Sequence, residues 1–222
     1  MNNPARLAAL VLLGAAAQFG TISTPLITGA MAAPDNRRAQ DSTVQPGLSA
    51  EIERYLNSIT TMRSRFLQIA PSGDISRGIV LLSRPGQLRI EYDPPVPVLI
   101  LTEGNWLMFY DKELEQPSYA PVRDTLAGFL IRKNIRLSDD DVSHKIFRGK
   151  GVVRVSITRR EAPESGKLTL VFSNNPLRLR QWTITDGRGE ETRVALEQPR
   201  FNGKIEAKEF EFTLPEREND NE

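Results

Sequence analysis

The chain has 222 residues, and its 29 Lys and Arg against 28 Asp and Glu give a formal net charge of +1 at pH 7. This near-neutral balance, without a Lys/Arg cluster that interleaves with aromatic residues, argues against nucleic acid as a partner. With no cysteine and a single histidine, the sequence offers no disulfide, no thiolate nucleophile and no transition-metal constellation.

Residues 1–32 have the pattern of a secretory signal peptide. Arg6 supplies the positive start, residues 7–17 are apolar, and 30–32 read Ala-Met-Ala, a small-x-small cleavage site. The apolar run is too short to span a bilayer, although an uncleaved anchor is the alternative. The pattern predicts export, with one domain of ordinary size after cleavage.

Residues 33–47 are polar and are expected to form a disordered leader, and 216–222 a charged flexible tail. The folded domain is expected to span 48–215. It begins with a helix for which Ser49 is the predicted N-cap. An apolar stripe at helical spacing (Ile52, Tyr55, Leu56 and Ile59) indicates that this helix packs on the rest of the domain.

Turn signals and apolar alternation predict about eleven strands after this helix. Their expected ranges are 62–69, 75–82, 88–92, 98–101, 106–110, 113–121, 142–147, 152–159, 167–173, 177–185 and 191–199, with a further alternating strand at Phe210 and Phe212. Pro117 demotes 113–121 to an edge strand. Strands 98–101 and 106–110 are apolar on both faces, so they need two apolar environments.

A short apolar helix is expected after Asp124, its predicted N-cap, and it contains Gly128. It could be a core plug or a movable lid, and the Gly-containing helix between strands favours the lid. Because helices do not alternate with strands, the fold class is α+β with an antiparallel sheet. A sheet this long curls. We therefore expect an incomplete, half-open antiparallel β-barrel of about eleven strands, with two or three helices as a lid in its concave side.

Several segments together resemble one family. These are Arg84-Pro85-Gly86, Glu91-Tyr92 before a proline pair, LILTEGNWLMFYDKELEQ at 99–116, Phe66-x-Gln68, TLAGFLI at 125–131, and Phe210-x-Phe212-Thr213-x-Pro215. In order and spacing they are similar to the LolA family of periplasmic outer-membrane lipoprotein carriers, over about residues 50–215.

The resemblance implies site residues. Arg84 matches the arginine that hydrogen-bonds the lid-helix backbone in the closed form, and Leu88 and Ile90 match lumen-facing positions where the family often has large aromatics. The acyl-chain cavity is expected to be lined by Leu88, Ile90, Tyr92, Leu99, Leu101, Trp106, Met108, Phe109, Leu126, Phe129, Leu130 and Trp182.

The resemblance also implies a periplasmic chaperone that shields lipoprotein acyl chains and ferries them from the inner to the outer membrane. The expected partners are acylated lipoproteins, a LolCDE-type ABC transporter and, where present, a LolB-type receptor, with the protein itself a monomer. A carrier of another lipid or glycolipid, or an RseB-like periplasmic sensor domain on the same fold, remains an alternative. His144 stands near Asp139–Asp141 without the spacing of a catalytic triad, so neither an enzyme nor a cofactor is expected.

Overall fold

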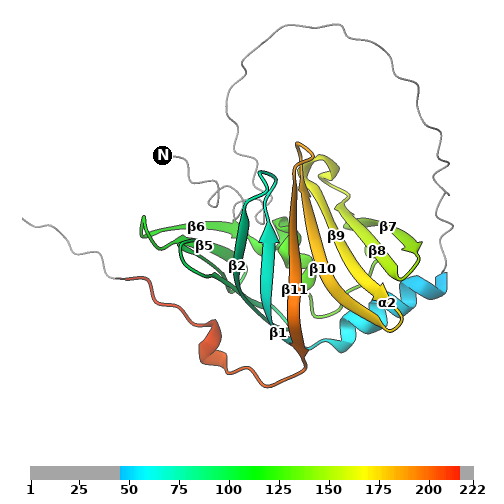
Figure 1. Cartoon of the computed structure of the whole chain (residues 1–222), viewed down its shortest axis with the longest axis horizontal. Coiled ribbons are helices and arrows are strands. Elements are labelled where there is room, and N and C mark those ends of the chain that lie inside the picture. The colour runs from blue at the N-terminus through cyan, green and yellow to red at the C-terminus, as the bar shows by residue number, and fades with distance from the viewer. Residues whose placement is uncertain (1–45, 216–222) are drawn as a thin grey trace, which may run out of the picture.

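The computed structural model describes residues 46–215, apart from the side chains of Pro46 and Leu126 (Figure 1). The expected signal peptide, most of the expected leader and the expected tail lie outside the described residues. The helices are α2 (Pro46–Ser58) and α3 (Leu126–Leu130), with 3-10 turns η2 (Val122–Asp124), η3 (Pro163–Ser165) and η4 (Ala207–Phe210). The strands are β1 (Thr61–Ile69), β2 (Ile75–Ser83), β3 (Gln87–Tyr92), β4 (Val98–Glu103), β5 (Trp106–Asp111), β6 (Gln116–Pro121), β7 (Val142–Gly149), β8 (Val152–Arg159), β9 (Gly166–Asn174), β10 (Leu177–Asp186) and β11 (Glu191–Phe201).

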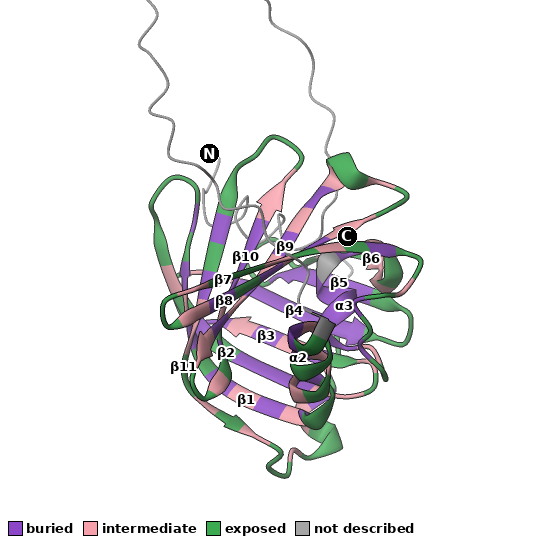
Figure 2. Cartoon of the chain, turned by 90° about the vertical axis from the view of Figure 1, so that its right-hand side faces the viewer, coloured by how far each residue is buried: buried purple, intermediate pink, exposed green. Residues whose placement is uncertain are grey.

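Within these residues the strands form a single antiparallel sheet in the order β6-β5-β4-β3-β2-β1-β11-β10-β9-β8-β7. Two meanders, β1–β6 and β7–β11, meet where β1 pairs with β11. The sheet curves around the helices, and β6 and β7 remain its two edges (Figures 1 and 2). This confirms the expected α+β class, the half-open barrel and the edge position of β6. None of the helices in the described part of the chain is long and apolar enough to cross a membrane.

The larger apolar core lies on the concave side of the sheet, where α2 and α3 pack (Figure 2). Ile52 and Leu56 of α2 are buried there, as the helical stripe in the sequence predicts. Alternate residues of each strand point to this core, such as Leu88 and Ile90 on β3. The sheet and the two helices therefore share one core.

A second, smaller cluster lies on the convex side. Leu81, Leu99, Leu101, Met108 and Tyr110 are buried there with Phe210. The segment that covers them is the C-terminal one, so the expected strand at Phe210 and Phe212 is wrong, because this segment forms the 3-10 turn η4. Strand β11 lies in the middle of the sheet, between β1 and β10. The chain that leaves β11 therefore has no free strand beside it to pair with, and it crosses the convex face instead.

Two helix starts also differ from expectation. Helix α2 begins at Pro46, so Ser49 lies inside it and not at its cap; a proline in the first turn costs little because its missing N–H would be unpaired there anyway. Thr125, not Asp124, caps α3 through its Oγ1, which accepts the N–H of Gly128 at 3.1 Å. Asp124 belongs to η2, where its backbone carbonyl accepts from Arg159.

Gly78 of β2 lies between two aromatic rings of neighbouring strands. Phe66 on β1 and Tyr92 on β3 are its ladder partners, and their rings meet edge to face with centroids 5.2 Å apart. A Cβ at position 78 would lie 2.2 Å from the carbonyl oxygen of Glu91 and 2.7 Å from the Phe66 ring. Only glycine allows this ring contact across β2.

The Gly78→Ala variant is therefore expected to lose about 2 kcal/mol of unfolding free energy, since the backbone of β3 must shift. Urea unfolding monitored by circular dichroism measures the loss. Gly203→Ala is the control, because a Cβ there would meet no atom within 4 Å. Equal stabilities for both variants would contradict the packing described for Gly78.

Candidate functional site

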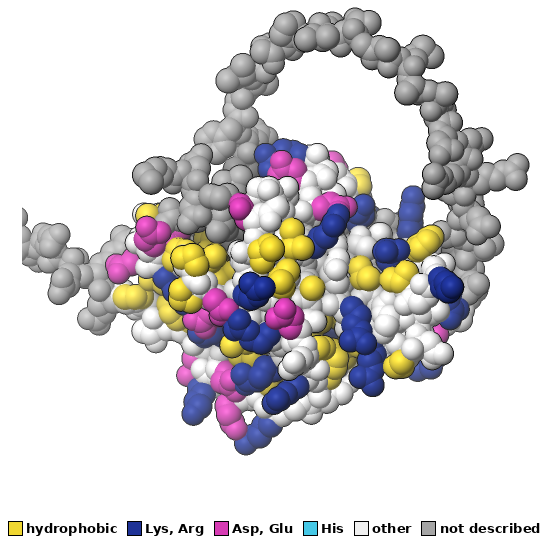
Figure 3. Space-filling view, viewed as in Figure 1, with side chains coloured by type: hydrophobic (Ala, Val, Ile, Leu, Met, Phe, Trp, Pro, Cys, Tyr) yellow, Lys and Arg dark blue, Asp and Glu magenta, His cyan; other side chains and the backbone are white. Residues whose placement is uncertain are grey.

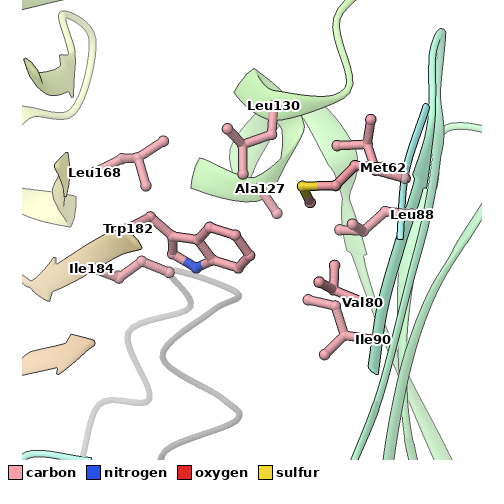
Figure 4. A pocket seen from close by; sticks show the side chains of 10 residues that line it. Met62, Val80, Leu88, Ile90, Ala127, Leu130, Leu168, Trp182 and Ile184 are labelled. Carbon is pink, nitrogen blue, oxygen red and sulfur yellow. The ribbon is translucent and has the colours of Figure 1, made fainter. Parts of the chain in front are cut away.

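A small apolar cavity lies on the concave side, between the two halves of the sheet and α3 (Figure 4). Its volume is about 20 Å³, and it is lined by Met62, Val80, Leu82, Leu88, Ile90, Ala127, Leu130, Leu168, Trp182 and Ile184. Every lining side chain is apolar. One water molecule needs about 10–15 Å³ of cavity volume, so the side chains of the sheet and α3 fill nearly the whole interior.

Arg84, in the turn between β2 and β3, holds α3 and α2 together. Its Nε donates to the carbonyl of Leu130 at 2.8 Å, and a terminal guanidinium nitrogen donates to the carbonyl of Leu56 at 2.5 Å. Gly86 of the same turn donates its N–H to Ile131 at 2.9 Å. Since the last carbonyls of a helix have no partner within the helix, one turn of the sheet supplies donors to both helix ends.

Burial lowers the pKa of Arg84 to about 10, so at pH 7 its guanidinium is still charged. Within residues 46–215, the ion pairs that the structure shows do not include Arg84, and its two acceptors are neutral carbonyls. The closed arrangement therefore contains a partly buried cation stabilised by carbonyl oxygens alone. Hydrogen bonds with a charged donor are stronger than neutral ones, which offsets part of the desolvation cost.

Helix α2 is also bound to the segment that follows α3. Asn57 donates to the carbonyl of Ile135 at 2.9 Å and accepts the N–H of the same residue at 2.8 Å. Glu53 accepts the N–H of Leu137 at 2.6 Å. Helix α2, α3 and residues 131–137 therefore form one hydrogen-bonded layer across the concave side, which we call the lid.

Two arginines connect the β7–β8 side of the sheet with the segment around α3. Arg159 of β8 donates to the backbone carbonyl of Asp124 at 3.1 Å. Arg132, just after α3, pairs with Asp141 and lies over the Phe129 ring, 5.1 Å from its centroid. These ion pairs are partly exposed, so each contributes little to stability.

The structure brings together several of the residues that the sequence predicts for the cavity. Leu88, Ile90, Leu130 and Trp182 line it (Figure 4). Three others, Tyr92, Phe109 and Phe129, are buried in the same concave core but do not line the cavity. The Tyr92 hydroxyl donates to Gln68 at 2.8 Å, and burial raises its pKa. Leu126 opens α3, but its side chain lies outside the described part of the chain.

Four further residues that the sequence predicts for the cavity do not face the concave side at all. Leu99, Leu101 and Met108 belong to the convex cluster under Phe210, because their neighbours Ile100 and Leu107 are the ones that face the concave core. Trp106 is two residues before Met108 on β5, so its side chain points to the same convex side, and it is 49% exposed at the β4–β5 turn. It borders a larger groove, of about 700 Å³, on the side of α3 that faces away from the cavity.

Sequence reasoning missed six of the lining residues: Met62, Val80, Leu82, Ala127, Leu168 and Ile184. Alternation within each strand could have found most of them. Met62 pairs with Leu82, and Leu82 with Leu88, so one concave position fixes the others through the ladder. No group of three or more metal-ligating side chains gathers anywhere in residues 46–215.

Comparison with known proteins identifies the family. The family model for the outer membrane lipoprotein carrier protein LolA matches residues 57–213, well over half of the chain. An outer-membrane lipoprotein carrier protein of Legionella pneumophila (strain Lens) is 34% identical over 178 residues, which is 75% of this chain and 86% of the relative. One of Chromohalobacter salexigens is 26% identical over 182 residues, 78% of this chain and 85% of that relative. A LolA-superfamily crystal structure from Nitrosomonas europaea matches with a TM-score of 0.41 and 15% identity, covering 74% of this chain and 97% of its own. The chain belongs to the LolA family of outer membrane lipoprotein carrier proteins.

Proposed function

We propose that this protein shields the acyl chains of lipoproteins on the concave side of its half-barrel and carries them from the inner to the outer membrane. One observation carries the proposal. An entirely apolar cavity lies under the short helix α3, whose last carbonyl accepts a hydrogen bond from Arg84. Membership of the lipoprotein carrier family supports the same cargo.

The physical need for such a cavity follows from the chemistry of acyl chains. Exposing each methylene group to water costs about 0.8 kcal/mol, so acylated proteins do not cross an aqueous compartment unaided. A cavity of about 20 Å³ has no room for such chains. Loading must therefore move the lid away from the sheet, which exposes the lining of Leu88, Ile90 and Trp182 to the cargo.

The route and partners are part of the proposal. The predicted signal peptide would deliver the chain to the periplasm as a monomer. A LolCDE-type transporter in the inner membrane would then supply cargo, and a LolB-type receptor would accept it at the outer membrane. The protein would act by binding and release, without catalysis or a cofactor. A lid that stays closed when empty keeps the apolar lining from other partners between these steps.

Native mass spectrometry of the protein purified from its own periplasm tests the proposal. The expected result is a complex with triacylated lipoprotein, which is absent when the acylated cysteine of the cargo is replaced by serine. The control is the Leu88→Glu variant of the carrier, which should be recovered without cargo. A bound glycolipid instead, or a partner protein retained equally with and without acylation, would contradict lipoprotein carriage and favour the other-lipid or sensor alternative.

A further inference from the structure

The two edges of the half-barrel differ in whether a further strand can pair with them. At β6, the N–H of Val122 donates to Asn105 at 2.8 Å, which fixes the alternation of the β5–β6 ladder. The backbone groups of Pro117, Tyr119 and Pro121 therefore point outward. Two of these three residues lack an N–H, so β6 is protected against strand addition.

Edge strand β7 has the opposite character. The N–H of Arg160 donates to Asp141 at 2.9 Å, so by the same alternation Val142, His144, Ile146 and Arg148 point their backbone groups away from β8. Val142 is satisfied locally, because its N–H donates to Asp139 and its carbonyl accepts from the Arg160 side chain. His144, Ile146 and Arg148 are not prolines, so each has an N–H to donate. In the described part of the chain β7 pairs only with β8. This edge presents up to three donors and three acceptors over eight residues.

The β7–β8 hairpin is basic beyond its start, which directly follows the acidic residues Asp139, Asp140 and Asp141. Residues 142–159 contain five Lys or Arg and no Asp or Glu. Of these, Arg159 is engaged by Asp124, and Arg154 lies over the half-exposed Phe147 ring at 5.7 Å. Figure 3 shows Lys and Arg side chains spread over the half of the convex face that leads to β7. An extended segment that pairs here would therefore gain from acidic side chains.

We propose that β7 binds the polypeptide linker of the cargo as an added strand, and that it favours an extended, acidic linker. The proposal rests on the lipoprotein carriage proposed above. With acyl chains on the concave side, the attached polypeptide has to leave the half-barrel, and the two sheet edges are where it can pair with strand backbone. Strand β6 is blocked by Pro117 and Pro121, whereas β7 offers backbone hydrogen bonds and positive charge.

A second copy of the chain fits this edge less well. In an antiparallel β7–β7 pair, Lys145 and Arg148 of both copies would come together, and neither strand contains an Asp or Glu to offset them. Like charges on opposing strands destabilise a pair. Charge therefore favours an acidic peptide over self-association.

The test compares two probes, a tripalmitoylated cysteine with a one-residue serine linker and the same cysteine with a nine-residue acidic linker. Affinities are measured by displacement of a fluorescent lipopeptide. Wild type should bind the long-linker probe more tightly. The His144→Pro variant removes one outward N–H and should lose about three- to tenfold in affinity for that probe alone. Tyr119→Pro makes the same change at the edge that is already protected, and should lose nothing.

The outcomes separate the two proposals. Wild type that binds both probes equally, or His144→Pro that keeps the preference, would overturn the role of β7 and leave carriage intact. Wild type that binds neither probe would count against carriage itself. A wild-type dimer in sedimentation that His144→Pro abolishes would assign the edge to self-association. If His144→Pro does not fold, Lys145→Glu with Arg148→Glu, both at exposed positions, replaces it and should lose the preference at low salt.

Discussion

Replacing Arg84 by leucine is expected to raise the affinity for acylated peptides about tenfold. Two charge-assisted hydrogen bonds, to Leu130 and Leu56, stabilise the closed lid. The substitution removes both bonds and also the cost of desolvating the guanidinium, and we expect the lost bonds to be the larger effect. When the closed state is less stable, a larger fraction of the protein is open and competent to bind. Release to an acceptor should slow by a similar factor.

Lipopeptide titration and the rate of transfer to acceptor vesicles measure these two effects. The Arg200→Leu variant is the matched control, because Arg200 is exposed on β11 and lies outside the lid. It should leave both quantities unchanged. Unaltered affinity in Arg84→Leu, with the fold intact, would show that Arg84 does not hold the lid.

The Leu88→Glu variant is expected to lose about a hundredfold in affinity for the same lipopeptide. Leu88 is 2% exposed and lines the cavity between Ile90 and α3. A carboxylate at this position would have to be desolvated beside the acyl chain, which costs several kcal/mol. Fluorescence titration under conditions in which the variant is folded measures the loss.

The Leu101→Glu variant separates this effect from loss of stability. Leu101 is buried to a similar extent, at 1% exposed, but on the convex side. Both variants should lose about 3 kcal/mol of unfolding free energy, yet only Leu88→Glu should lose binding. Equal losses of affinity would place the acyl site elsewhere than the concave side.

The strands and their order of appearance could be predicted because their signals are local. Turn residues such as Pro85-Gly86 and alternation such as Leu88-Arg89-Ile90 depend only on neighbours in the sequence. The short helix over the cavity was found for the same reason. Its cap was misplaced by one residue, because Asp124 and Thr125 are both good caps and only the geometry of η2 selects Thr125.

The cavity could be predicted only in part, because its lining depends on contacts between distant segments. Strands β4 and β5 are apolar on both faces, so the sequence cannot say which face meets the lid and which meets another element. That second element is the segment of Phe210, about 100 residues away, which covers Leu99 and Leu101. Leu168 on β9 and Ile184 on β10 pair with each other and line the cavity opposite β3. These strands lie far from β3 in the strand order, and only the curvature of the sheet brings them close to it.

Opening of the lid on loading is the central claim, and a distance measurement tests it most directly. The chain has no cysteine, so Lys133→Cys on the lid with Arg193→Cys on β11 places two spin labels without competing sites. Electron–electron resonance should show a longer distance when tripalmitoylated cysteine is bound than when the protein is empty, while an Arg77→Cys and Arg193→Cys pair within the sheet stays unchanged. An unchanged lid distance with ligand fully bound would contradict the account.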